Sequence, residues 1–231
     1  MRSRPAINCW SPPRVNLLDL IFPPRCGGCG AEGVPWCDRC VASLQPIAPT
    51  TLDGIPLVAA GQLDGPLQRA IHTYKYRPRP GLAAVLAEPL RRAIGAARLD
   101  LSGLAYVPLH PQRRRERGFN QAERLAAALA GPLRLPVVGG LARVRPTPAQ
   151  VGLSQPERQV NMVGAFAWTA ATRPPSRLAL VDDVCTTGAT LAAAAEAVAR
   201  AGGSIGAFLV LARAQTLPAL AVTFPAQTAW P

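Results

Sequence analysis

The residues best suited to chemistry lie in the stretch LALVDDVCTTGAT, from Leu178 to Thr190. Its apolar start predicts a buried strand that ends on two adjacent acids, Asp182 and Asp183, and the alanine-rich segment after Thr190 predicts a helix. Backbone amides at the start of a helix, with threonine hydroxyls and Gly188 beside them, can bind a phosphate group. The two carboxylates can accept hydrogen bonds from sugar hydroxyls or help to hold Mg²⁺. The stretch therefore predicts a site for a ribose 5-phosphate.

The same stretch has a purely structural interpretation. Thr187 could cap the following helix while the acids lie partly solvated at the end of the strand. One acid would suit that interpretation, but two acids followed by two threonines and a glycine favour a ligand. The candidate ligand-binding residues are Asp182, Asp183, Val184, Cys185, Thr186, Thr187, Gly188, Ala189 and Thr190.

Four of the six cysteines form a second cluster, within CGGCGAEGVPWCDRC. Two C-x2-C pairs separated by a short loop have the spacing of a structural zinc site with four thiolate ligands. Two disulfides or a redox pair are the competing interpretations, and a cytosolic chain disfavours the disulfides. We expect a structural Zn²⁺ with no open position for catalysis, held by Cys26, Cys29, Cys37 and Cys40.

The chain carries a formal charge of +12, and 24 of its 25 basic residues are arginine. A strong positive charge favours anionic partners such as nucleotides or nucleic acid. Codon bias towards arginine explains the excess equally well. Lys75 is the one lysine, which indicates a site that needs a compact ammonium rather than a planar guanidinium.

Length and composition indicate a globular protein. The 231 residues are 49% hydrophobic and 16% charged, which excludes a disordered chain. No apolar run is long enough to span a membrane. Prolines and Asp19 interrupt the N-terminal apolar patch, which makes it a poor signal peptide. We therefore expect a cytoplasmic location.

Strands and helices alternate from residue 103 to 213, which predicts an α/β fold with a parallel sheet and helices on both faces. Residues 46–57 are expected to form a Pro- and Gly-rich link. Gly131 and Pro132 are expected to stop a helix that begins near residue 117. The expected strands cover about 57–65, 101–111, 135–145, 165–168, 177–184 and 204–214, and the other expected helices 66–77, 80–97 and 190–203. In such sheets ligands bind beyond the carboxyl ends of the strands, where the acids of LALVDDV lie.

LALVDDVCTTGAT resembles the phosphoribosyl-diphosphate (PRPP) signature of type I phosphoribosyltransferases. With the cysteine pairs, YKYRPRP, VPLHPQRRRERGFNQAERLA and TPAQVGLSQPERQVNMVGAF in that order, the chain resembles the ComF (ComF/GntX or ComFC-like) family over about residues 17–213. Pro78 stands where members of the family often have glycine. The resemblance implies a type I phosphoribosyltransferase fold with a small hood, preceded by a four-cysteine zinc segment.

The resemblance also implies an organisation of the chain. Residues 17–45 would form the zinc-knuckle segment and 46–213 the phosphoribosyltransferase-like domain, with a hood at about 55–100 and a core sheet at 103–213. Residues 1–16 form an unassigned leader, and 214–231 an irregular tail.

The resemblance assigns roles to residues outside the signature. It implies a diphosphate site after the first core strand. The alternative is that the arginines there form a solvated loop. The candidate diphosphate-binding residues are Pro108, Leu109, His110, Arg113, Arg117, Gly118 and Asn120. Residues 143–161, which include Gln150 and Arg158, resemble a loop that closes over the ligand, with a disordered loop as the alternative. Lys75 and Arg77 would reach an anionic ligand from the hood, or extend along the surface of a helix. The residues expected to act in catalysis are Asp182, Asp183 and Arg158.

Two functions are consistent with these features. The first is transfer of ribose 5-phosphate from PRPP, with Mg²⁺, to an unidentified acceptor. The second is a non-catalytic accessory role in DNA uptake, implied by the resemblance. Such a protein would bind single-stranded DNA or PRPP and act with uptake machinery such as a helicase.

Overall fold

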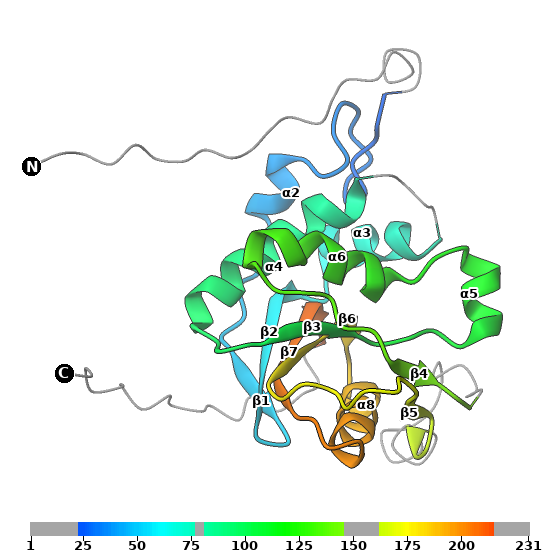
Figure 1. Cartoon of the computed structure of the whole chain (residues 1–231). Helices are drawn as coiled ribbons and strands as arrows, with labels where there is room; N and C mark the ends of the chain where they lie inside the picture. The colour runs from blue at the N-terminus through cyan, green and yellow to red at the C-terminus, as the bar shows by residue number, and fades with distance from the viewer. Residues whose placement is uncertain (1–22, 77–80, 146–161, 215–231) are drawn as a thin grey trace, which may run out of the picture.

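The computed structural model describes residues 23–76, 81–145 and 162–214 (Figure 1). The leader, the C-terminal tail and most of the 143–161 segment lie outside the described residues. The helices are α2 (Asp38–Ala42), α3 (Gly65–Tyr76), α4 (Leu82–Ala97), α5 (Pro111–Arg117), α6 (Gln121–Leu133) and α8 (Ala189–Arg200). The strands are β1 (Thr50–Leu52), β2 (Ile55–Gln62), β3 (Gly103–Tyr106), β4 (Leu141–Arg143), β5 (Phe166–Trp168), β6 (Leu178–Cys185) and β7 (Ile205–Arg213).

The main sheet has five strands in the order β1-β2-β7-β6-β3. Strands β2, β7, β6 and β3 run parallel, and β1 pairs antiparallel with β2 at one edge. Residues Leu178–Val181 and Leu209–Ala212 have no exposed surface, because parallel strands covered on both faces need apolar side chains in both directions. The α/β prediction is confirmed, with a sheet that is mixed rather than wholly parallel.

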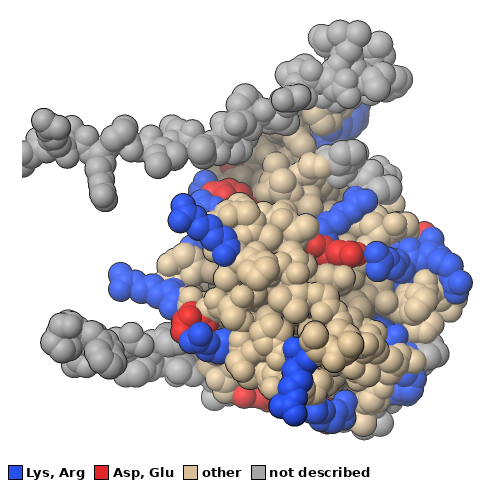
Figure 2. All heavy atoms as spheres, viewed as in Figure 1, with Lys and Arg blue, Asp and Glu red and all other residues tan. Residues whose placement is uncertain are grey.

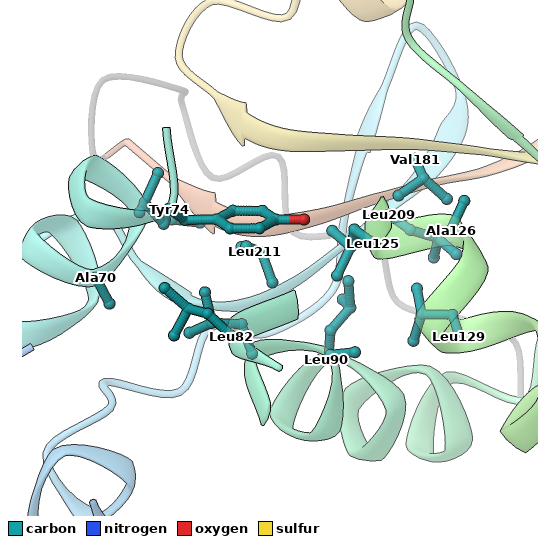
Figure 3. Close-up of a cluster of buried hydrophobic side chains, with 14 of the residues drawn as sticks. Ala70, Tyr74, Leu82, Leu90, Leu125, Ala126, Leu129, Val181, Leu209 and Leu211 are labelled. Atoms are coloured by element: carbon teal, nitrogen blue, oxygen red, sulfur yellow. The ribbon is translucent and has the colours of Figure 1, made fainter. Parts of the chain in front are cut away.

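Helices cover both faces of this sheet, as the alternation of elements predicts. Helices α3, α4 and α6 lie on one face, and α8 lies on the other with the small β4–β5 sheet (Figure 1). Figure 3 shows the first layer, where Tyr74 of α3 and leucines of α4 and α6 meet β7 and β6. This layer also contains Cys26, Trp36 and Cys40, so the four-cysteine segment shares the main core.

The expected strand over 135–145 is wrong for most of its length. Only β4 forms, and it pairs with β5 in a separate two-stranded sheet. Val137 makes a single bridge to β3, next to Pro136, which has no N–H to continue a ladder. Gly140 breaks the segment further with a φ of +130° and the Trp168 ring packed closely against it.

Three other expectations need correction. Helix α6 continues through Pro132 to Leu133, even though a proline there has no N–H to donate to the preceding turn. Part of the 46–57 link forms a hairpin whose turn, Asp53–Gly54, has positive φ at both residues, the Asp-Gly signal of a two-residue turn. Strand β2, from the stretch assigned to the hood, pairs with β7 inside the main sheet.

Candidate functional site

The two adjacent acids continue strand β6 beyond its apolar core. Consecutive strand residues point to opposite faces of a sheet, and Val181 packs in the layer of α3, α4 and α6 while Leu180 packs in the layer of α8. The same alternation directs Asp183 towards α3 and Asp182 towards α8 and β4. The acids therefore meet different partners.

Asp183 is paired with the chain's one lysine. Lys75 Nζ, at the end of α3, lies 3.1 Å from Asp183 Oδ1. The lysine side chain is 25% exposed and the carboxylate side chain 13%, so water screens this pair less than it screens a surface ion pair. Burial, followed by the charge of Asp183, raises the pKa of Tyr74, so this hydroxyl stays protonated beside the pair.

Asp182 occupies a different electrostatic environment. Its Oδ1 accepts a 2.7 Å hydrogen bond from the backbone N–H of Asp183. Burial, then the charge of Asp183, raises the pKa of Asp182 to about 7. Lys75 and Arg143 oppose that rise. Burial, then the charge of Arg113 of α5, lowers the pKa of Arg143, so cations of α3 and β4 act on Asp182 and a third lies near Arg143.

The turn after β6 forms a shallow hollow at the start of α8. Residues 184–191 line it, and Gly188, with a φ of +81°, is the N-cap residue just before α8. The Thr187 hydroxyl lies 3.5 Å from the Ala189 amide nitrogen, a long contact for a cap. The first N–H groups of a helix have no acceptor within it, and the Gly188 N–H is used by the Cys185 sulfur. The hollow is therefore suited to an anion, although the Gly188 N–H points into the protein, towards the Cys185 sulfur.

The carboxyl end of β3 lies beside the part of β6 that leads into the two acids. Tyr106 pairs with Val181, and the Val107 N–H donates to the Val181 carbonyl at 2.9 Å. The chain then enters α5, a short helix that replaces the solvated loop considered above, and His110 Nδ1 accepts from the Gln112 N–H at its start at 3.4 Å. Both polar turns thus lie at one edge of the sheet, on neighbouring strands.

Asn120 and Gln121 are used inside the protein. Asn120 Oδ1 accepts from the Ala122 N–H at 3.0 Å, and its Nδ2 donates to the Val107 carbonyl at 3.0 Å. These bonds fix the start of α6 to the end of β3. Gln121 Nε2 donates to the Lys75 carbonyl at 3.4 Å, and the Tyr74 hydroxyl donates to the Gln121 carbonyl at 2.8 Å.

Most of the predicted site residues that the structure describes lie near the carboxyl ends of β6 and β3. Lys75 contacts Asp183, a partner that neither interpretation above named for it. The Cys185 side chain is buried in the core, and burial raises its pKa to about 12, so it is no nucleophile. Pro108 is buried, and Leu109, Arg113 and Arg117 are half-buried near the second turn. Arg77, Gln150 and Arg158 lie outside the described residues.

Sequence reasoning missed two contacts of the site. The Leu52 side chain lies beside Gly188, where a Cβ would stand 2.6 Å from a methyl carbon of the leucine. The Asp-Gly turn after Leu52 could have indicated this strand. The Gln121 bridge between α3 and α6 has no sequence signal, because its partners are backbone carbonyl and hydroxyl groups.

The four cysteines have the geometry of a metal centre. Their sulfur atoms all lie within 4.8 Å of one another, and the Cys26–Cys40 and Cys29–Cys37 sulfurs are each 3.6 Å apart. Four thiolates at zinc-bonding distance are separated by about 3.8 Å, so the cluster fits Zn²⁺. A backbone hydrogen bond from Ala31, then Arg39, lowers the pKa of Cys29 to about 6, which favours the thiolate form that binds metal.

Glycine lets the four-cysteine segment pack against α3. A Cβ on Gly28 would lie 3.0 Å from the Pro66 side chain of α3, and 2.8 Å from the Trp36 ring within the segment. Arg69 Nε donates to the Gly28 carbonyl at 2.6 Å, and the Thr73 hydroxyl to the Gly27 carbonyl at 3.3 Å. The segment is thereby fixed to the helix that carries Lys75.

Basic residues gather over α5, at the right of Figure 2. Arg114 and Arg115 are exposed, and Arg114 pairs with Glu123 at 3.1 Å. Arg117 lies over the ring of Tyr76, 5.3 Å from its centroid, and that tyrosine is 59% exposed. Among the described helices, none is long and apolar enough to cross a membrane.

Comparison with curated proteins shows the family of this chain. The chain is 33% identical to Competence protein F of Haemophilus influenzae over 183 residues, which cover 72% of this chain and 80% of the relative. The chain belongs to the ComF family. It is also 32% identical to DNA utilization protein YhgH of Salmonella typhimurium, over 83% of this chain and 81% of the relative. The corresponding Escherichia coli K12 protein is 29% identical. No protein-family model matches the chain.

Proposed function

We propose that this ComF-family chain binds PRPP and transfers its ribose 5-phosphate to an acceptor within a pathway of DNA uptake or use. The observation that carries the proposal is the arrangement at one edge of the sheet. The anion-suited hollow of residues 184–191, the acids of β6 and the start of α5 lie on neighbouring strands. The proposal includes the type I phosphoribosyltransferase fold and the division into a 17–45 zinc-knuckle segment and a 46–213 domain.

Each part of PRPP has a chemical counterpart in this arrangement. The 5-phosphate suits the amides at the start of α8, and the ribose hydroxyls suit the carboxylates. The diphosphate suits Arg113 and Arg117 at the second turn, because guanidinium groups bind phosphate in two-pronged hydrogen bonds. Departure of diphosphate leaves positive charge on the ribose, which the neighbouring carboxylates would stabilise. Mg²⁺ would enter with the diphosphate.

The direct test is calorimetric titration of PRPP with Mg²⁺ into the wild type and into Asp182→Ala/Asp183→Ala. We expect the double variant to bind at least about tenfold more weakly, since each lost charged hydrogen bond contributes about 1.5–3 kcal/mol. Asp53→Asn is the control, because Asp53 is an exposed acid of the β1–β2 turn and asparagine tolerates its φ of +51°. Equal affinities for the wild type and the double variant would end the assignment.

The surface over α5 supports a second candidate function, which is binding of single-stranded DNA. Competence protein F and DNA utilization protein YhgH are named for processes that involve DNA. Tyr76 offers an exposed ring beside Arg117, and aromatic rings with arginines suit stacked bases and phosphates. If this surface binds DNA, affinity for an oligothymidine will fall steeply with salt and fall in Arg114→Ala/Arg115→Ala. An affinity that neither salt nor these substitutions change would exclude this function.

A further inference from the structure

The structure pairs Asp183 with a cation of the chain itself. The acid pair was expected either to accept hydrogen bonds from a sugar or to help hold Mg²⁺. Lys75 Nζ lies 3.1 Å from Asp183 Oδ1, and both side chains are mostly buried. The position at which a divalent cation would meet this carboxylate therefore already holds a positive charge.

Contacts on two sides hold the end of α3 that carries this ammonium. On one side Gln121 Nε2 donates to the Lys75 carbonyl, and Gln121 is itself tied to the Tyr74 hydroxyl. On the other side Arg69 and Thr73 donate to carbonyls of the four-cysteine segment. These bonds fix the backbone from which the lysine extends, so its ammonium is directed at Asp183 by the fold.

A divalent cation bound by the Asp183 carboxylate would lie close to the Lys75 ammonium. Mg²⁺ requires near-octahedral oxygen ligands at about 2.1 Å and gives up its waters reluctantly. A cation about 3 Å from the same oxygen repels it strongly at low exposure. Strand alternation also turns Asp182 towards the opposite face, so the two acids do not converge on one ion from the same side.

We propose that Lys75 is a specificity-determining residue that keeps divalent cations off Asp183, so that Mg²⁺ reaches the site only on the diphosphate of the ligand. The identity of that ligand rests on the proposed function. The exclusion of metal from Asp183 does not rest on the proposed function, because it can be measured with the metal alone.

The first experiment measures Mn²⁺ binding to the full-length, zinc-loaded protein by electron paramagnetic resonance, without ligand. We expect Lys75→Met to bind Mn²⁺ at least about tenfold more tightly than the wild type, because the repelling charge is gone. Adding Asp183→Asn to that variant should abolish the gain, and Lys75→Arg, which keeps the charge, should bind Mn²⁺ as weakly as the wild type. Equal Mn²⁺ affinity for Lys75→Met and the wild type would overturn the proposal.

The second experiment needs no substitution in the lysine and remains valid if Lys75→Met fails to fold. Because Lys75 is the one lysine, acetylation by an amine-reactive ester followed by peptide mass spectrometry reports on it alone, with the α-amine as internal reference. We expect Asp183→Asn to raise the labelling rate severalfold and 10 mM Mg²⁺ alone (roughly a saturating level) to leave the wild-type rate unchanged. A rise with Mg²⁺ alone would overturn the proposal, because it would mean that the metal displaces the ammonium. Failure of the wild type to bind PRPP would instead contradict the proposed function and leave this result standing.

Discussion

At the scale of single residues, Asp182 and Asp183 show how strand geometry separates neighbours in sequence. Asp183 points to the face covered by α3 and meets Lys75. Asp182 points to the other face, where the charge of Arg143 of β4 lowers its pKa against the larger effect of burial. One carboxylate thus pairs with an ammonium, while the other binds its proton more tightly than a free aspartate does.

Stability should therefore depend on pH through Asp182. Its pKa is raised to about 7 in the folded protein, compared with about 3.9 in the unfolded chain. The folded state binds the proton more tightly, so this stabilisation is complete below about pH 4 and is lost as the pH rises through 7. Asp182→Asn removes the titration. Relative to the wild type, we expect it to gain about 1–3 kcal/mol of unfolding free energy between pH 5 and pH 8.

Urea unfolding of both proteins at the two pH values measures this gain. Asp53→Asn is a suitable control, because Asp53 is exposed and has a φ of +51° that asparagine also tolerates. A difference between Asp182→Asn and the wild type that is the same at both pH values would contradict the prediction.

At the scale of elements, the turn from β6 to α8 is shaped by a strand far away in the sequence. Gly188 has a φ of +81°, and the methyl carbons of Leu52 from β1 occupy the space where a Cβ would stand. Backbone conformation and close packing therefore both demand glycine here. The edge strand β1 thus helps to fix the loop proposed to bind phosphate.

Gly188→Ala should consequently destabilise the protein and weaken PRPP binding. We expect a loss of about 2–4 kcal/mol, from backbone strain together with the clash against Leu52. Gly54→Ala is the matched control, since Gly54 has a φ of +79° with open space around it; strain alone should cost about 1 kcal/mol there. Thermal unfolding of both variants tests the difference.

A double-mutant cycle isolates the clash from the strain. Leu52→Ala should cost less in the Gly188→Ala background than in the wild type, by about 1 kcal/mol or more, because it removes the atoms that the new Cβ meets. Additive effects of the two substitutions would show that the Leu52 contact plays no part.

At the scale of the whole molecule, the four-cysteine segment is continuous with the α/β core. Cys26, Trp36 and Cys40 belong to the same buried cluster as α3 and α4, and backbone carbonyls of the segment accept hydrogen bonds from α3. A bound zinc ion would therefore support the helix that delivers Lys75, as well as the segment's own fold.

Removal of zinc should loosen these parts together and spare the sheet. After chelation, we expect amide hydrogen exchange to accelerate in residues 26–40 and in α3, because both lose a packing partner. Protection in β6 and β7 should change little, since these strands are mostly buried and have a strand on each side in the sheet. Acceleration throughout the chain, or none in α3, would contradict this coupling.

The sequence alone determined the features that depend on local pattern. Alternating apolar runs predicted the α/β fold, the two C-x2-C pairs predicted the sulfur cluster, and LALVDDVCTTGAT predicted a strand, a polar turn and a helix. These signals are local because hydrophobic period, ligand spacing and glycine placement lie within a few residues of each other. The Asp53–Gly54 hairpin was equally readable and was missed.

Only the tertiary structure decided which side chains meet. Lys75 reaches Asp183 across 108 positions of sequence, Leu52 covers Gly188, and residues 135–145 leave the main sheet to form β4. Such contacts depend on strand order and on the packing of helices across a sheet, which no local pattern encodes. For that reason the sequence identified Asp182 and Asp183 as candidates. Only the tertiary structure showed that Asp183 pairs with Lys75 and that Asp182 binds a proton more tightly than a free aspartate does.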